Sequence, residues 1–207
     1  MLRRFCNMSE EIQDFDPQEE EIMEATYQAL VKCGYSGLTV QAISDEFDKS
    51  KSLMYYHYED KDDLLADFLE HAIRRFRRNM ELKMDEPKAQ LDELVDRLVP
   101  SKLKDDSYQF RIALLELQSE APHDEQVREQ YTRINRTLRD VIARIVRRGI
   151  DRGVFADVDP EVEAEILVSL LFGIRARRLT TDENLRGTDA RNAIKTHLDR
   201  LNANEEE

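Results

Sequence analysis

The stretch KSKSLMYYHYEDKDDLL, residues 49–65, decides how the chain folds. Its first ten residues hold two lysines, two serines, a histidine and three tyrosines, and no acid. Ser50 is a residue type that begins helices, so a short helix is predicted to run to about Tyr56. Asp60 begins a longer helix with a wide apolar face. A short polar helix is therefore followed directly by a long amphipathic one.

Two further short helices are predicted on the N-terminal side of this stretch. Asp16, followed by proline, begins a helix that Gly34 ends. Thr39 begins a second helix, and Asp48 and Lys49 form the turn between it and the tyrosine-rich helix. Three short helices, the last two joined by a tight turn, form a helix-turn-helix, which sets its third helix into the major groove of DNA. The long helix after it is a connector.

The remainder of the chain is also predicted to be helical, because apolar residues recur at helical spacing and do not alternate as in a strand. The fold class is therefore all-α, with an N-terminal three-helix helix-turn-helix domain, a connector helix and a C-terminal helical domain. The later helices are expected to begin near Pro87, Asp124, Asp159 and Thr188, with one more around Phe110. The expected division is a disordered acidic N-terminus over 1–16, the helix-turn-helix domain over 17–66, the C-terminal domain over 67–203 and a tail over 204–207.

Composition limits the classes of function. The longest apolar run, Ile166 to Ile174, is shorter than the roughly 20 residues that cross a bilayer. The first residues lack the apolar stretch of a signal peptide, so we expect a cytoplasmic protein without membrane contact. Cys6 and Cys33 are isolated, and no grouping of Cys, His and Asp has metal-ligand spacing, so no metal, cofactor or disulfide is expected.

The net charge of −13 argues at first against a nucleic-acid partner. The acids are unevenly placed, however, because eight lie between Ser9 and Glu24 and none lies in the tyrosine-rich helix. The chain also has 9 lysines against 22 arginines. Many acids with few lysines are typical of a high-salt cytoplasm, so we expect a halophilic source.

The tyrosine-rich helix carries the chemistry that DNA recognition uses. Serine and lysine reach phosphates or base edges, and tyrosine hydroxyls donate to phosphates while the rings pack on sugars. Thr39 and Lys61 lie at helix N-termini, where backbone N–H groups also favour phosphate. By spacing alone, packing is an equal alternative for the tyrosines.

Residues from about 22 to 69 resemble the DNA-binding domain of the TetR family of transcriptional regulators. The resemblance rests on Gly34, Thr39, Val40, Ile43, Tyr55, Tyr56, His57, Tyr58, Lys61, Asp63, Leu64 and Leu65. It implies that the domain over 17–66 binds DNA through Thr39, Lys49, Ser50, Lys51, Ser52, Leu53, Tyr55, Tyr56, His57 and Lys61. In the turn, Asp48 and Lys49 replace the family's usual glycine and apolar residue. Aspartate tolerates turn geometry, and Lys49 is expected to contact phosphate instead.

The C-terminal region is similar to the BetI-type branch of the same family, over residues 147–155, 159–160 and 170–174. This resemblance implies that the domain over 67–203 binds a small-molecule effector and dimerises through its last two helices. A two-fold dimer sets paired recognition helices about 34 Å apart on a palindromic operator. The predicted interface residues are Ile166, Leu167, Leu170, Leu171, Ile174, Ile194, Leu198 and Leu201.

Aromatic and methionine side chains are the candidates for the wall of an effector cavity. They are Phe76, Met80, Tyr108, Phe110, Tyr131, Phe155 and Phe172, with core packing as the alternative at each one. Arg175, Arg177 and Arg178 are expected either to contact an acidic effector or to flank the dimer interface.

The expected function is that of a ligand-responsive repressor, which binds double-stranded operator DNA as a homodimer and has an unidentified small molecule as its effector. Two alternatives come from other classes. One is a helical interaction protein whose helix-turn-helix no longer binds DNA, which the acidic charge and the altered turn favour. The other is a helical enzyme, but no nucleophile elbow, phosphate loop or metal motif is present, so no catalytic residue is assigned.

Overall fold

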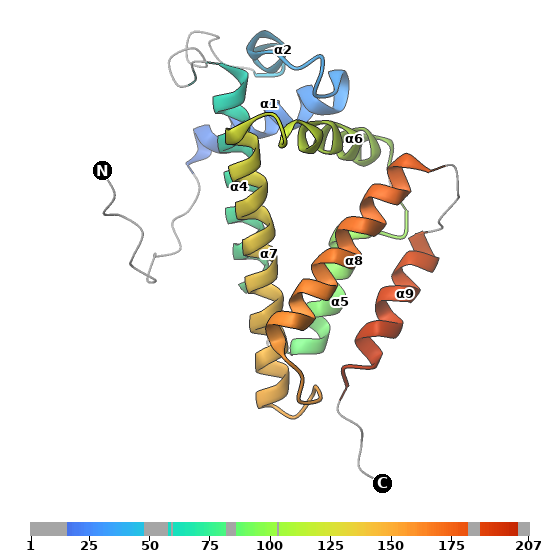
Figure 1. Ribbon diagram of the computed structural model, residues 1–207. Coiled ribbons are helices and arrows are strands. Elements are labelled where there is room, and N and C mark those ends of the chain that lie inside the picture. Colours follow the sequence, from blue (N-terminus) through green and yellow to red (C-terminus); the bar gives the residue numbers. More distant parts are fainter. Residues whose placement is uncertain are drawn as a thin grey trace.

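The structure is a computed structural model that describes residues 16–47, 58, 60–81, 86–102, 104–181 and 187–202. Throughout these ranges the regular elements are helices (Figure 1), which confirms the predicted all-α class. The helices are α1 (Pro17–Cys33), α2 (Val40–Asp45), α4 (Lys61–Glu81), α5 (Pro87–Leu98), α6 (Asp105–Glu120), α7 (Glu125–Asp151), α8 (Pro160–Thr180) and α9 (Gly187–Asp199). No described helix is both long and apolar enough to cross a membrane.

Local capping chemistry sets most of the helix ends. The side chain of Asp16 accepts a hydrogen bond from the backbone N–H of Gln18 at 3.0 Å, and Thr39 Oγ1 accepts one from Ala42 N at 3.0 Å. Gly34 ends α1 with a φ of 66°, a left-handed conformation that suits glycine. The predicted start of the last helix was wrong by a short margin, because α9 begins at Gly187 and already contains Thr188.

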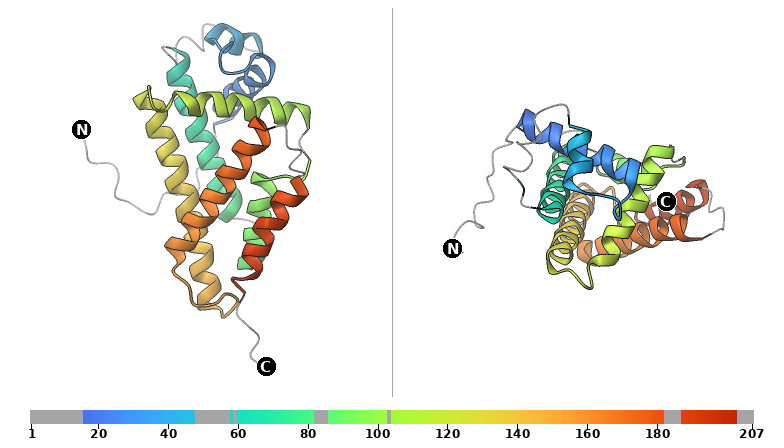
Figure 2. Two further views of the ribbon diagram at one scale, coloured as in Figure 1. Left: turned by 45° about the vertical axis from the view of Figure 1, so that its right-hand side comes forward. Right: turned by 90° about the horizontal axis from the view of Figure 1, so that it is seen from above.

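The helices pack around two hydrophobic cores. The first core, which we call the head core, is formed by α1, α2, the first half of α4, α6 and the start of α7, and its members include Leu30, Ile43 and Leu64. The second, the body core, is formed by α5, the rest of α7, α8 and α9. The long helices α4 and α7 lie side by side (Figures 1 and 2), and both contribute side chains near the two cores.

Helix α6 packs against α1 on one side and against α7 and α8 on the other (Figure 1), so it connects the helix-turn-helix domain to the C-terminal domain. Its Ala113 and Leu117 are buried in the head core beside the residues of α1. Glu116 Oε2 accepts a hydrogen bond of 3.1 Å from the backbone N–H of Tyr35, in the connection between α1 and α2. The ring of Tyr27 in α1 lies 4.6 Å from that of Phe110 in α6, measured between centroids. A displacement of α6 would therefore act directly on the residues of the helix-turn-helix domain that α6 contacts.

Candidate functional site

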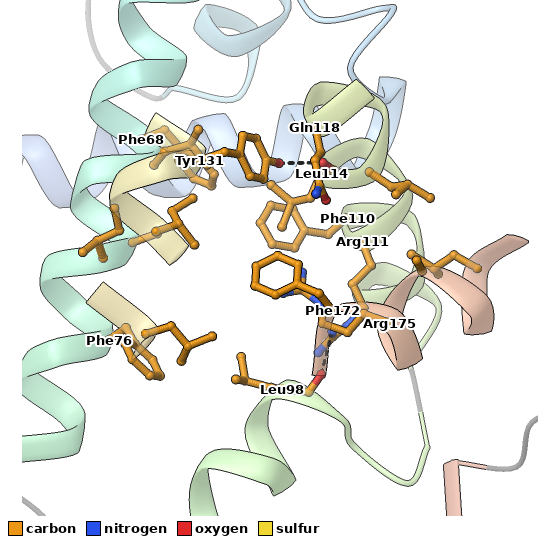
Figure 3. Close-up of a pocket in the computed structure, with 18 of the residues that line it drawn as sticks. Phe68, Phe76, Leu98, Phe110, Arg111, Leu114, Gln118, Tyr131, Phe172 and Arg175 are labelled. Atoms are coloured by element: carbon orange, nitrogen blue, oxygen red, sulfur yellow. Dashed lines mark hydrogen bonds between the residues drawn. The ribbon is translucent and has the colours of Figure 1, made fainter. Parts of the chain in front are cut away.

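A cavity of about 610 Å³ lies between the head core and the body core (Figure 3). Six helices contribute to its wall, namely α1, α4, α5, α6, α7 and α8. Most of the wall is apolar, and aromatic rings are prominent in it: Phe68, Phe76, Phe110 and Phe172. This volume lies within the range of about 300–1,000 Å³ that small-molecule sites occupy. The wall has the character of a binding site for a largely apolar molecule.

Four of the seven side chains proposed for a cavity wall do line it, namely Phe76, Phe110, Tyr131 and Phe172. Phe155 does not, because its side chain is buried in the body core against Gly149. Tyr108 is exposed and lies outside the wall. The side chain of Met80 lies outside the described residues.

Tyr131 and Tyr27 add hydroxyl groups to the cavity wall. The hydroxyl of Tyr131 donates a hydrogen bond of 2.7 Å to the carbonyl of Leu114 (Figure 3). Burial raises the pKa of the Tyr131 hydroxyl, so it stays neutral. Tyr27 belongs to α1, so the helix-turn-helix itself contributes to the wall. Sequence reasoning missed Tyr27, because nothing in its helical spacing separates a cavity wall from a core.

Two arginines supply the charge in the cavity wall. Arg111 of α6 donates to the carbonyls of Leu98 at 3.1 Å and Arg97 at 3.3 Å. Burial, followed by the nearby charges of Arg175 and Arg178, lowers the pKa of Arg111 to about 10. Burial also lowers the pKa of Arg175. The sequence predicts an acidic-effector contact or an interface flank for Arg175, and it marks nothing at Arg111.

An apolar stripe lies on the surface of α8. The exposed fractions of Val162, Ile166 and Leu170 are 55%, 39% and 36%, and their spacing of four residues keeps them on one face. The other proposed interface residues are buried within the subunit, where they pack in the body core: Leu167, Leu171, Ile174, Ile194, Leu198 and Leu201. The sequence pattern correctly marks two apolar helices but does not separate the inner face from the outer one.

Two of the proposed DNA-binding residues are described, and both lie at helix starts. Thr39 is exposed and caps α2, while Lys61 begins α4 with its Nζ 4.7 Å from the centroid of the Tyr35 ring. The remaining proposals lie outside the described residues, namely Lys49, Ser50, Lys51, Ser52, Leu53, Tyr55, Tyr56 and His57. Tyr58, by contrast, is buried in the head core.

Two family models match the chain. Residues 22–68 match the model of bacterial regulatory proteins of the tetR family, and residues 87–203 match the C-terminal model of BetI-type transcriptional repressors. No curated protein matches the sequence.

Three of the similar solved structures are those of transcriptional regulators. A TetR transcription regulator from Haloarcula marismortui is 35% identical, with a TM-score of 0.77 over 91% of this chain and 100% of that one. A transcriptional regulator from Saccharomonospora viridis, solved in complex with choline, is 22% identical, with a TM-score of 0.72 over 91% and 98% of the two chains. A TetR-family regulator from a Rhodococcus species is 22% identical, with a TM-score of 0.71 over 90% and 99%.

Proposed function

This chain belongs to the tetR family of bacterial regulatory proteins, and on that premise we propose that it is a ligand-responsive repressor acting as a homodimer on a palindromic operator in the cytoplasm. The observation that carries the proposal is the cavity whose wall includes Tyr27 of α1 and six residues of α6. A molecule bound there contacts the helix-turn-helix and the helix that supports it. Such a molecule changes operator affinity only if it binds the DNA-competent and DNA-incompetent states unequally.

The effector role has support from a relative, because the regulator from Saccharomonospora viridis was solved with choline bound. In our proposal, the bound molecule shifts α6, which carries both the cavity residue Arg111 and the Glu116 carboxylate on Tyr35. Coupling between two such sites is typically about 1–3 kcal/mol, or roughly 5- to 150-fold in affinity.

Operator binding is proposed to depend on Lys51 and Tyr55, which match positions that meet DNA in the family. Replacing Lys51→Ala or Tyr55→Phe is expected to weaken operator binding by about 1–3 kcal/mol without unfolding the protein. A gel-shift titration on the DNA upstream of its own gene measures the affinity, and the melting temperature of each variant reports on folding. Lys102→Ala, an exposed lysine between α5 and α6, is the control and should bind like the wild type. Unchanged affinity in either test variant would disprove the placement of the recognition helix.

Salt is proposed to support both folding and operator binding. The net charge of −13 makes acidic side chains repel one another and the DNA phosphates in dilute buffer. Molar KCl shortens the Debye length to about 3 Å, so the repulsion is screened. An ordinary DNA-binding protein loses about 0.9 log units of affinity per neutralised phosphate for each decade of salt. Here we expect a shallow or inverted slope, together with a melting temperature that rises with KCl.

Two titrations test the salt proposal, one of operator affinity and one of melting temperature, each from dilute buffer to molar KCl. A steep loss of affinity in a protein that is already fully stable in dilute buffer would show that the acidic surface is not a salt adaptation. The same two titrations can be run on the similar regulator from Haloarcula marismortui, so that the salt dependence of the two proteins can be compared.

A further inference from the structure

The charge in the cavity is of one sign. Arg111 and Arg175 are the charged residues of its wall among the described residues, and the wall contains no aspartate or glutamate. Their side chains reach the lower end of the cavity from α6 and α8, near Leu98 (Figure 3). The opposite end and the sides are formed mostly by aromatic rings and aliphatic side chains, with the Tyr131 hydroxyl and the Gln118 amide at the top. The cavity is therefore amphipathic, with a cationic end and an apolar body.

The two guanidinium groups have different surroundings. Arg111 is held by two backbone carbonyls at the end of α5, which use two of its five N–H donors. Arg175 has a ring as its neighbour, with its guanidinium carbon 5.7 Å from the centroid of Phe172. No acidic side chain contributes to the pKa shift of either group in the described part of the chain. The neighbours of the two positive charges are thus backbone carbonyls, the Phe172 ring and the neutral hydroxyls of Tyr27 and Tyr131.

A guanidinium stays protonated at neutral pH in proteins, so both groups carry a positive charge. The pKa of Arg111 is lowered to about 10 by burial and then by the other arginines, which is still well above 7. Burial of a charge without an opposite charge destabilises the folded state, and the two cations also repel each other. An anion placed between them relieves both effects. A carboxylate does so with the geometry that a guanidinium fork matches best, through paired N–H···O bonds.

We propose that the effector is an amphipathic carboxylate, whose head group lies on Arg175 and Arg111 and whose apolar body lies among the aromatic rings of α4, α6 and α8. This inference rests on the proposed function, because it names the chemical class of the effector for the same cavity. A cationic head group is disfavoured beside the two arginines, since no acidic side chain among the described wall residues offsets its charge.

Matched probes separate the head group from the body. Decanoate and 2-naphthoate carry the carboxylate, 1-decanol and 2-naphthalenemethanol keep the body without the charge, and decyltrimethylammonium reverses the charge. Calorimetric titration of the full-length protein measures each dissociation constant. At least one carboxylate should bind about 10- to 100-fold more tightly than its alcohol, as expected for charge-assisted hydrogen bonds, and the cation should not bind. If neither carboxylate binds more tightly than its alcohol, the inference is overturned.

Variants of α8 locate the head group. Arg175→Met keeps the unbranched apolar stem of the side chain and removes the charged guanidinium, so it should weaken carboxylate binding about 10- to 100-fold and leave alcohol binding unchanged. Arg177→Met is the matched control, because Arg177 lies two residues away, is exposed and does not line the cavity. Unchanged carboxylate affinity in Arg175→Met would overturn the inference. The free Arg175→Met protein should melt no lower than the wild type, because an uncompensated cation has been removed. If Arg175→Met does not fold, Arg175→Lys replaces it as the test variant, because it keeps the charge but loses the guanidinium fork.

Gel shifts with the same proteins distinguish this inference from the proposed function. If the protein binds its operator and a neutral or cationic probe releases it while both carboxylates fail, the carboxylate inference is wrong and the repressor function stands. If carboxylates bind through Arg175 but no operator complex forms at any salt concentration, the inference stands and the repressor function is wrong.

Discussion

Glutamate at both Ile166 and Leu170 is expected to separate the proposed dimer into monomers and to weaken operator binding by about 10²–10⁴-fold. Both side chains are exposed in the subunit, at 39% and 36%, so the subunit itself should keep its fold. In the proposed two-fold dimer the stripe on α8 would meet its own copy, so each new carboxylate would face a like charge in place of an apolar contact. A monomer carries one recognition helix and loses the gain in affinity from two linked half-sites.

Sedimentation velocity measures the loss of the dimer, and a gel shift on the full palindrome measures the loss of affinity. The matched control is Tyr108→Glu, which places the same charge on another exposed large apolar side chain, outside the stripe. The control should remain dimeric and bind the operator normally. A dimeric Ile166→Glu/Leu170→Glu variant would show that copies of the chain associate through a different surface.

Phe155→Ala is expected to destabilise the protein by about 3–5 kcal/mol, the usual effect of removing a buried phenyl ring. Phe155 has an exposed fraction of 4% and packs directly on Gly149 of α7. A Cβ atom at Gly149 would lie 2.0 Å from Cδ2 of that ring, so Gly149→Ala should cost about 1–3 kcal/mol through overpacking. The two effects should not add. Once the ring is absent, alanine keeps only its advantage in a helix, and Gly149→Ala should stabilise the Phe155→Ala protein by about 0.5–1 kcal/mol.

Urea denaturation of the two single variants and the double variant, at one protein concentration, measures this change of sign. Gly173→Ala in α8 is the control, because a Cβ atom there meets no other atom within 4 Å. It should stabilise the protein by about 0.5–1 kcal/mol. If Gly149→Ala stabilised the wild type as much as Gly173→Ala does, the close packing of Phe155 on α7 would be contradicted.

The parts of the fold that could be predicted are those that depend on chemistry within a few residues. Asp16, Thr39 and Asp159 each accept hydrogen bonds from backbone N–H groups of the turn they precede, so their helix starts are visible in the sequence. Gly34 marks the end of α1 for an equally local reason, its positive φ. The family resemblance rests on the same short-range pattern and is confirmed by the two model matches.

The site depends on which surfaces meet, and the sequence pattern does not carry that information. Leu198 and Ile166 both fit an apolar helical stripe, yet Leu198 packs inside the subunit and Ile166 faces outward. Phe155 and Phe172 are equally aromatic, but Phe155 fills the body core and Phe172 lines the cavity. Arg111 looks like an ordinary helix arginine, and only the approach of Arg175 from a helix 64 positions later gives it a role.

The head core also limits the transfer of the helix-turn-helix domain to another protein. Ala113 and Leu117 of α6 and Val127 of α7 are buried together with the residues of α1, α2 and α4. A hybrid regulator joined at residue 66 would therefore separate the apolar side chains of α1, α2 and α4 from the residues of α6 and α7 that they pack against here. To exchange operator specificity between relatives, the surface of α6 that faces this domain must be transferred together with it, or must be redesigned to pack against the new domain.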